Sequence, residues 1–128
     1  DEVYHFLLRE VLFHGLIMIP GTHNAESICY AGHLVHTHPP PHVFQMLFGM
    51  GGALAGAVYK KGYDVEIYCP MCFPEGNISK AMAYLARRIT ENTSQMSFLA
   101  QHAGPRLQEV TKMLDKNLPP ARKENMRA

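Results

Sequence analysis

The sequence lacks several features that would assign it to a common class of protein. No apolar run in its 128 residues approaches the roughly 20 residues that a membrane-spanning helix needs. The formal net charge is only +1, so there is little to attract nucleic acid or an anionic membrane surface. The chain opens on Asp1-Glu2 without a basic leader and an apolar core, so we expect no targeting segment in it. Hydrophobic residues make up 47% and charged residues 18%, a composition typical of a globular protein.

Cysteine is scarce as well. The three cysteines are Cys29, Cys69 and Cys72, an odd number of which only the last two lie close in the sequence. This spacing does not fit a disulfide framework and favours a reducing compartment. The length is enough for one small domain.

Apolar periodicity predicts helices over residues 2–13, 24–35, 51–61, 77–93 and 107–116, and strands over 16–21, 42–47 and 64–68. In the first helix Val3, Leu7 and Val11 lie near one face, which Phe6 and Leu8 widen. The first strand is a short apolar run that ends at Pro20-Gly21, as in a strand buried on both faces. Asn24 or Thr22 caps the second helix, and Gly62 ends the third. A polar tail from Pro119 is expected to be loose.

Alternating helices and strands are typical of consecutive βα units with parallel strands, so the predicted fold class is α/β. A sheet of three parallel strands would leave both edges unpaired and its faces short of cover. Three units are also too few for a closed (β/α)8 barrel, which usually takes about 250 residues. The pattern therefore predicts part of a larger structure.

Polar residues stand at two places where ligands are bound in parallel α/β folds. Gly21-Thr22-His23-Asn24 lies where a strand ends and a helix begins, a position from which side chains and free helix N–H groups contact phosphates. The same residues also fit a helix that is simply well capped. Gln45 lies in an otherwise apolar strand, where an amide needs either a ligand or a backbone partner.

The predicted helix over residues 77–93 has two different sides. Met82, Leu85, Ala86 and Ile89 form an apolar stripe, and Tyr84, Arg87, Arg88 and Glu91 gather on the opposite side. Two adjacent guanidinium groups can hold one carboxylate through paired hydrogen bonds. Helix geometry alone favours the plainer interpretation, in which this side faces solvent.

A metal site is the alternative that the cysteines and histidines raise. Cys69 and Cys72 have CxxC spacing, and the cluster from His33 to His42, with His36 and His38 between, stands beside a proline-rich loop. A redox dithiol requires its first cysteine at a helix start, whereas a loop with Pro74 and Gly76 follows here. This alternative predicts a non-catalytic βα module that binds metal or a protein partner through these residues.

Taken together, the motifs closely resemble the last part of the proline dehydrogenase barrel. The family shows Thr-His-Asn after a strand, then Phe-Gln-x-Leu-x-Gly-Met, then Tyr-x-Pro, and then a helix with Ala-Tyr-Leu-x-Arg-Arg-x-x-Glu-Asn before a Ser-Phe pair. The sequence has these in order, at residues 22–24, 44–50, 68–70, 83–92 and 97–98. The resemblance covers residues 15–99. It implies three consecutive βα units, strands six to eight of a partial (β/α)8 TIM-like barrel, in residues 1–99, with a C-terminal helix and loose tail in residues 100–128.

The resemblance also implies FAD-dependent oxidation of L-proline to 1-pyrroline-5-carboxylate, with electrons passed to a quinone. By position, the residues that would contact FAD are Thr22, His23, Asn24, Gln45 and Glu91. Those that would bind proline are Arg87, Arg88, Tyr68 and Leu47, the arginines at its carboxylate. The resemblance implies no catalytic residue and no metal ligand in this segment. The family's earlier strands, which supply the remaining contacts to substrate and flavin, are absent from it. The chain is therefore expected to be inactive alone.

Some positions depart from the family's pattern, and some questions stay open. Phe48 stands where the family often has histidine, and the loop after Tyr68 differs from the common small and polar version. The bulk of Tyr68 favours proline over hydroxyproline. The expected location is mitochondrial in a eukaryote, and cytoplasmic or peripheral to the inner membrane in a bacterium. The sequence leaves open whether the enzyme is monofunctional or fused to an aldehyde dehydrogenase.

Overall fold

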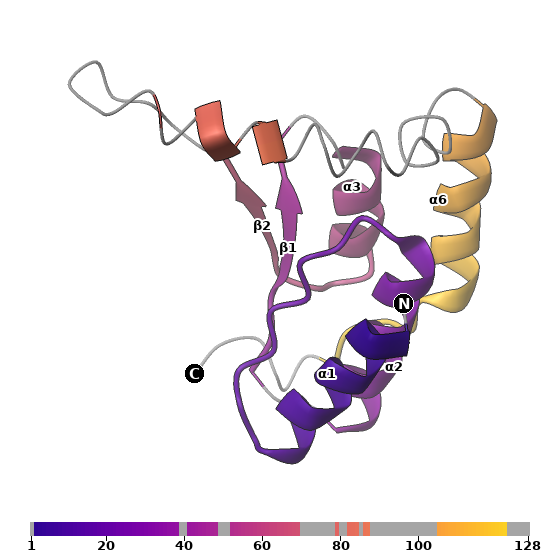
Figure 1. The fold of residues 1–128 in the computed structure, drawn as a ribbon. Helices are drawn as coiled ribbons and strands as arrows, with labels where there is room; N and C mark the ends of the chain where they lie inside the picture. Colours follow the sequence, from indigo (N-terminus) through magenta and orange to yellow (C-terminus); the bar gives the residue numbers. More distant parts are fainter. Residues whose placement is uncertain are drawn as a thin grey trace.

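The computed structural model describes residues 2–38, 41–48, 52–69, 79, 82–84, 86–87 and 105–122. In chain order these hold α1 (Glu2–Phe13), α2 (Ala25–Thr37), β1 (Phe44–Leu47), α3 (Gly52–Lys60), β2 (Val65–Tyr68) and α6 (Pro105–Asn117) (Figure 1). Each lies where the sequence predicts an element of its kind. Residues 79, 82–84 and 86–87 are helical, within the helix predicted over 77–93; the rest of that range lies outside the described residues.

The sheet is parallel, as the α/β prediction requires. β1 pairs with β2 so that Phe44 lies opposite Val65 and Leu47 opposite Tyr68. Residues 16–21 extend along β1, where Met18 and Gly21 form isolated parallel bridges to His42 and Gln45. The described strands thus confirm the α/β class, although two strands and a bridged segment do not by themselves make a barrel.

The prediction of a strand over residues 16–21 buried on both faces is wrong in two respects. The segment makes bridges instead of a regular strand, because Pro20 has no N–H to donate to a ladder. It is also buried on one face only: Met18 is fully buried, whereas Ile17 and Ile19 are 65% and 52% exposed. The described part of the chain covers only one side of the sheet.

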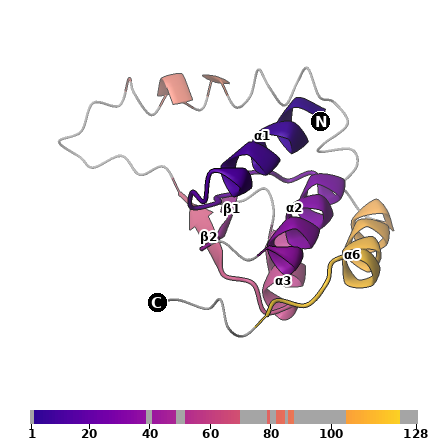
Figure 2. The ribbon, with the colours of Figure 1, turned by 90° about the horizontal axis from the view of Figure 1, so that it is seen from below.

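The covered side of the sheet holds the core. Phe44 and Met46 of β1 are 0% and 1% exposed and join one cluster with Ile28 of α2 and Leu54 of α3. In both ribbon views α2, α3 and α6 lie on the same side of β1 and β2 (Figures 1 and 2). Because successive strand residues point to opposite faces, the neighbours Gln45 and Leu47 face away from these helices.

Helix α1 packs on α2 through a face that differs in part from the predicted one. Val3 and Leu7 are 74% and 54% exposed, whereas Leu8 is buried and Tyr4 packs against the core. His5 lies between the two helices: its Nε2 is 3.1 Å from the hydroxyl of the buried Ser27, and its ring stacks on Tyr30 at 4.2 Å. Leu8 and Val11 of the predicted face thus pack as expected, whereas Tyr4 packs in place of Val3 and Leu7.

Two features of the turns and the C-terminal part follow from local chemistry. Gly62 ends α3 at a φ of 90°, a conformation that favours glycine. Residues 119–121 are held by hydrogen bonds, where a loose tail was expected from Pro119: the carbonyl of Pro119 accepts from Tyr63 and the N–H of Ala121 donates to Lys61. The division of the chain at residues 99 and 100 stays a prediction.

The buried Tyr63 and the half-buried Tyr4 make the stability of the fold sensitive to alkaline pH. Burial raises the pKa of both Tyr4 and Tyr63 from 10.0 to about 12. Between these values the unfolded chain loses a proton that the folded chain keeps. The free energy of unfolding should therefore fall as the pH rises from 10 towards 12, and solvent near the partly exposed Tyr4 ring reduces its share of the fall.

Urea unfolding at a series of pH values checks this dependence. Tyr4→Phe and Tyr63→Phe should each flatten the alkaline fall, with Tyr59→Phe, which removes an exposed hydroxyl, as the control. The two variants should differ at pH 7, since the Tyr4 hydroxyl is buried with no hydrogen-bond partner among the described residues, and that of Tyr63 is bonded to Pro119. An equally steep fall in both variants would contradict the assignment.

Candidate functional site

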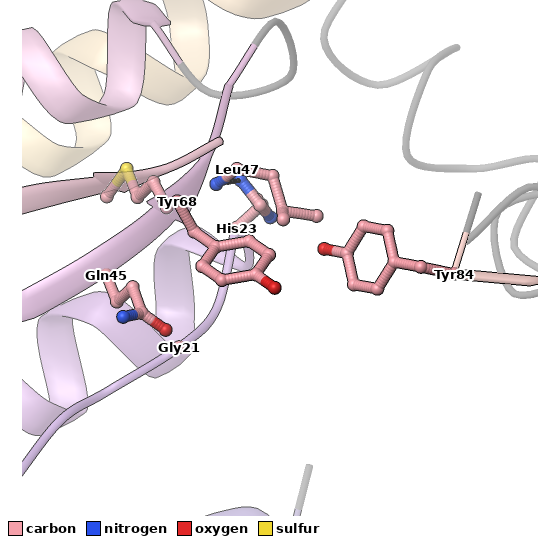
Figure 3. Close-up of a pocket in the computed structure, with 7 residues that line it drawn as sticks. Gly21, His23, Gln45, Leu47, Tyr68 and Tyr84 are labelled. Carbon is pink, nitrogen blue, oxygen red and sulfur yellow. Dashed lines mark hydrogen bonds between the residues drawn. The ribbon is translucent and has the colours of Figure 1, made fainter. Parts of the chain in front are cut away.

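The described residues form a pocket at the carboxyl ends of the parallel strands. It has a volume of about 330 Å³ and is lined by Gly21, His23, Gln45, Met46, Leu47, Tyr68 and Tyr84 (Figure 3). Gly21, Leu47 and Tyr68 are each at the end of one of three adjacent parallel segments. This edge is where parallel α/β proteins bind ligands. The volume lies at the lower end of the roughly 300–1,000 Å³ usual for small-molecule sites.

His23 links two of these segments. The backbone N–H of Leu47 donates a hydrogen bond of 3.0 Å to Nε2 of His23, so this nitrogen is an acceptor and the neutral ring carries its proton on Nδ1. The contact fixes the loop after residues 16–21 against the end of β1. His23 thus lines the pocket and orders its wall, while its contact with FAD stays a prediction.

Thr22 and Asn24 lie beside His23 but do not line the pocket. The Thr22 hydroxyl accepts from the N–H of Asn24 at 3.1 Å, and the Asn24 side chain accepts from Glu26 and Ser27 at 2.9 and 3.4 Å. Asn24 is the N-cap of α2, so the capping interpretation of this motif is correct for Asn24. These bonds hold the strand-to-helix turn in shape and leave the ligand roles of Thr22 and Asn24 as predictions.

Gln45 supplies the polar group in the middle of the pocket wall. Its side chain lies on the face of β1 opposite the buried Phe44 and Met46, and its amide points into the space beside Gly21 (Figure 3). Within the described part of the chain this amide has no hydrogen-bond partner, and the residue is only half-buried. The pairing of Gln45 with Glu66 sets a carboxylate next to it on the same face.

Two tyrosines face each other across the pocket. The rings of Tyr68 and Tyr84 are 5.6 Å apart at 54°, and both hydroxyl groups point into the space between the lining residues (Figure 3). Tyr84 was not predicted as a pocket residue. The signal was present in the sequence, because Tyr84 lies three residues before Arg87 and therefore shares its side of the helix.

The described helical residues 82–84 and 86–87 are exposed except for Tyr84. Tyr84 turns towards the pocket, whereas Met82, from the stripe predicted to be buried, is 59% exposed. In Figure 1 the helical residues 82–84 and 86–87, drawn in orange-red, lie beyond the arrowheads of β1 and β2. Of the polar side of this segment, Tyr84 reaches the pocket, whereas Arg87 is exposed.

The predicted carboxylate-binding residues are only partly in view. Arg87 is exposed and does not line the pocket. Arg88 and Glu91 lie outside the described residues. Among the lining residues seen here none carries a formal charge, so a charged substrate would need Arg87 or groups from elsewhere to balance it.

The alternative metal site gains no support from the residues in view. Within them no group of three or more histidine, cysteine, aspartate or glutamate side chains could hold a metal ion. His36 hydrogen-bonds the Pro120 carbonyl, and His42 packs edge-on against Phe44 and Tyr63. Cys69 is exposed, and Cys72 lies beyond the described ranges.

Among the described residues, none of the helices has the length and the apolar character that crossing a membrane requires.

The fold and the pocket together define an α/β protein of the kind that binds small ligands at the carboxyl ends of parallel strands. The chain belongs to the proline dehydrogenase family, whose model, described as Proline dehydrogenase, matches residues 1–101.

Curated relatives agree with this assignment. The bifunctional protein PutA of Salmonella typhimurium is 35% identical over 82 residues, which are 61% of this chain and 6% of that protein. PutA of Rhizobium meliloti is 32% identical over 88 residues, 67% of this chain and 7% of that protein. Proline dehydrogenase 2 of Bacillus subtilis is 28% identical over 101 residues, 77% of this chain and 31% of that protein. The chain thus spans less than a third of each of these relatives. No solved structure is a significant match.

The hydrogen bond to His23 is open to a direct test. His23→Ala should leave the Leu47 N–H without its side-chain acceptor, speed the hydrogen exchange of that amide, and lower the free energy of unfolding by about 1 kcal/mol. His33→Ala on the exposed side of α2 is the control and should change neither quantity. An unchanged exchange rate at Leu47 in His23→Ala would remove the ordering role.

Proposed function

We propose that this chain is the last part of the (β/α)8 barrel of an FAD-dependent proline dehydrogenase, contributing strands six to eight. The reaction would be oxidation of L-proline to 1-pyrroline-5-carboxylate, with electrons passed to a quinone. The observation that carries the proposal is the position of Tyr84 in the pocket. Tyr84 faces Tyr68 across the pocket at 5.6 Å, although Met82 of the apolar stripe stays exposed. A polar side chain that turns inward from a helix, as Tyr84 does, fits a ligand site beneath that helix.

The open face of the sheet supports the barrel. Ile17 and Ile19 are 65% and 52% exposed on the side away from the helices, and Tyr68, on the side of Leu47, is 44% exposed. In a (β/α)8 barrel this side of every strand points into a packed interior. The chain spans 31% of the Bacillus subtilis relative, which leaves room for the remaining units in a longer protein.

The pocket residues fit the edge of a flavin. Gln45 presents an amide, with both donor and acceptor, on the inner face of the sheet where no described residue bonds it. His23 lines the same pocket and accepts a hydrogen bond from the Leu47 N–H. The turn of Thr22 and Asn24 begins α2 at this edge of the sheet. Glu91 is the further residue proposed to contact FAD. When bound, the flavin supplies the acceptor for the hydride that leaves proline.

The protein's own part in the reaction would be to hold and orient the substrate. Arg87 and Arg88 would hold the proline carboxylate through paired, charge-assisted hydrogen bonds. Leu47 and Tyr68 would contact the ring, and Tyr84, which faces Tyr68, closes the same space. The bulk of Tyr68 favours proline over hydroxyproline. Quinone reduction would bring the complete enzyme to a membrane surface, on the inner mitochondrial membrane or its bacterial counterpart.

The isolated 128-residue chain should neither bind FAD tightly nor oxidise proline. It holds three of the eight barrel strands at most, so the pocket lacks its other walls and the shielding from water that the chemistry needs. Absorbance near the flavin bands after purification, and proline-dependent reduction of a dye, measure the two properties. Both signals together in the pure chain would contradict the proposed division of the site.

The roles of the arginines are testable in a longer protein that carries this segment within a complete barrel. Arg87→Met and Arg88→Met should each raise the KM for proline about 10- to 100-fold, because each removes a hydrogen bond to a charged group. Arg9→Met, on the exposed surface of α1, is the matched control and should leave KM unchanged. If KM stays the same in both pocket variants, the carboxylate lies elsewhere.

A further inference from the structure

The C-terminal part of the described chain lies beyond the family match but is firmly packed. The match ends at residue 101, whereas α6 and residues 118–121 follow it. We call α6 with residues 118–121 the C-terminal clamp. Its Leu114 and Leu118 are 0% and 2% exposed, and α6 packs against both α2 and α3 (Figure 2). A segment outside the shared family region thus contributes two of the core's fully buried leucines.

The contact between the clamp and α2 is shaped for a glycine. A Cβ atom placed on Gly32 would overlap Cδ1 of Leu118, so an alanine there would force the end of the Leu118 side chain to move. The space that the missing side chain leaves on α2 is therefore filled by Leu118. Gly32 and Leu118 are thus in direct contact, although they lie 86 residues apart in the sequence.

Hydrogen bonds then join the clamp to the ends of two helices. The N–H of Ala121 donates to the Lys61 carbonyl at 2.8 Å, and the Lys61 ammonium donates to the Asp115 carbonyl of α6. The ring Nδ1 of His36, near the end of α2, donates to the Pro120 carbonyl at 3.1 Å. The clamp thereby spans the C-terminal ends of α2 and α3.

The most buried of these contacts reaches the sheet. The hydroxyl of Tyr63, a residue that is 2% exposed, donates to the Pro119 carbonyl at 2.8 Å, with the Gly32 carbonyl at 3.4 Å as a weaker second acceptor. Its ring packs edge-on against Phe44 at 5.2 Å and His42 at 5.7 Å. Tyr63 stands two residues before β2, beside the first bond of the β1–β2 ladder, from the Phe44 N–H to the Asp64 carbonyl.

We propose that the C-terminal clamp sets the register of β2 through Tyr63, which makes Tyr63 a positioning residue for Tyr68 at the other end of the strand. The ladder between the two ends is only four residue pairs long. A slip by one residue would move Tyr68 to the opposite face of the sheet. This assignment concerns the fold and its pocket wall, and it holds whether or not the pocket binds proline.

Hydrogen exchange on the full 128-residue chain tests the proposal residue by residue. Tyr63→Phe keeps the ring and removes the hydrogen bonds, so the amides of Phe44 and Phe48, which close the two ends of the ladder, should exchange about tenfold faster. The amides of α1 should keep their rates. Tyr59→Phe, on the exposed side of α3, is the matched control and should change none of them.

A double-mutant cycle tests the fit of the clamp on α2. Gly32→Ala should speed exchange in the ladder, because the new methyl group displaces Leu118. Leu118→Ala should speed it too, but Gly32→Ala should add nothing in that background, since the clash is gone.

Three results would overturn the proposal. The first is equal acceleration across α1 and the ladder in Tyr63→Phe, which would make the clamp a general stabiliser. The second is additive effects of Gly32→Ala and Leu118→Ala. The third is a ladder whose amides are unprotected in the unaltered chain, because a register that is not formed cannot be set.

Discussion

The burial of Phe44 and Met46 between the sheet and its helices is the constraint on which the other features depend. Both side chains are almost fully buried, and they leave β1 with one orientation only. Gln45 and Leu47 must then face the other way, towards the pocket. The parallel register passes this choice to β2, where Tyr68 lies opposite Leu47. The composition of the pocket wall is therefore decided by which residues of β1 enter the core.

Most of the elements could be predicted from the sequence because their signals are local. Asn24 caps α2, Gly62 ends α3, and short apolar runs mark β1 and β2. The errors arise where tertiary contacts decide. The pattern of α1 fits a buried stripe at Val3-Leu7 nearly as well as one at Tyr4-Leu8, and only packing on α2 chooses between them. Hydrophobicity along residues 16–21 predicts burial but does not say whether a second layer of chain covers the sheet.

The candidate site shows the same division. His23, Gln45, Leu47 and Tyr68 line one pocket, because they lie at or near the carboxyl ends of adjacent parallel segments, and their ligand roles stay predictions. Tyr84 escaped prediction as a lining residue, since helix geometry alone assigns its side to solvent. Whether a helix presents its polar side outward or inward depends on what lies beneath it, and a helical wheel carries no information on that. The roles of Arg88 and Glu91 stay predictions, because both lie outside the described residues.

The one-sided cover of the sheet also has a consequence for how the chain behaves at high concentration. Among the described residues β2 is hydrogen-bonded along one side only, and apolar side chains such as Ile17 and Ile19 stand on the uncovered face. An unpaired strand edge beside an apolar surface is a template for aggregation between molecules. Closing a sheet into a barrel removes its edges and buries that face, so closure protects solubility as well as shaping a site. A lysine on such an edge is one of the ways in which natural sheets oppose pairing between molecules.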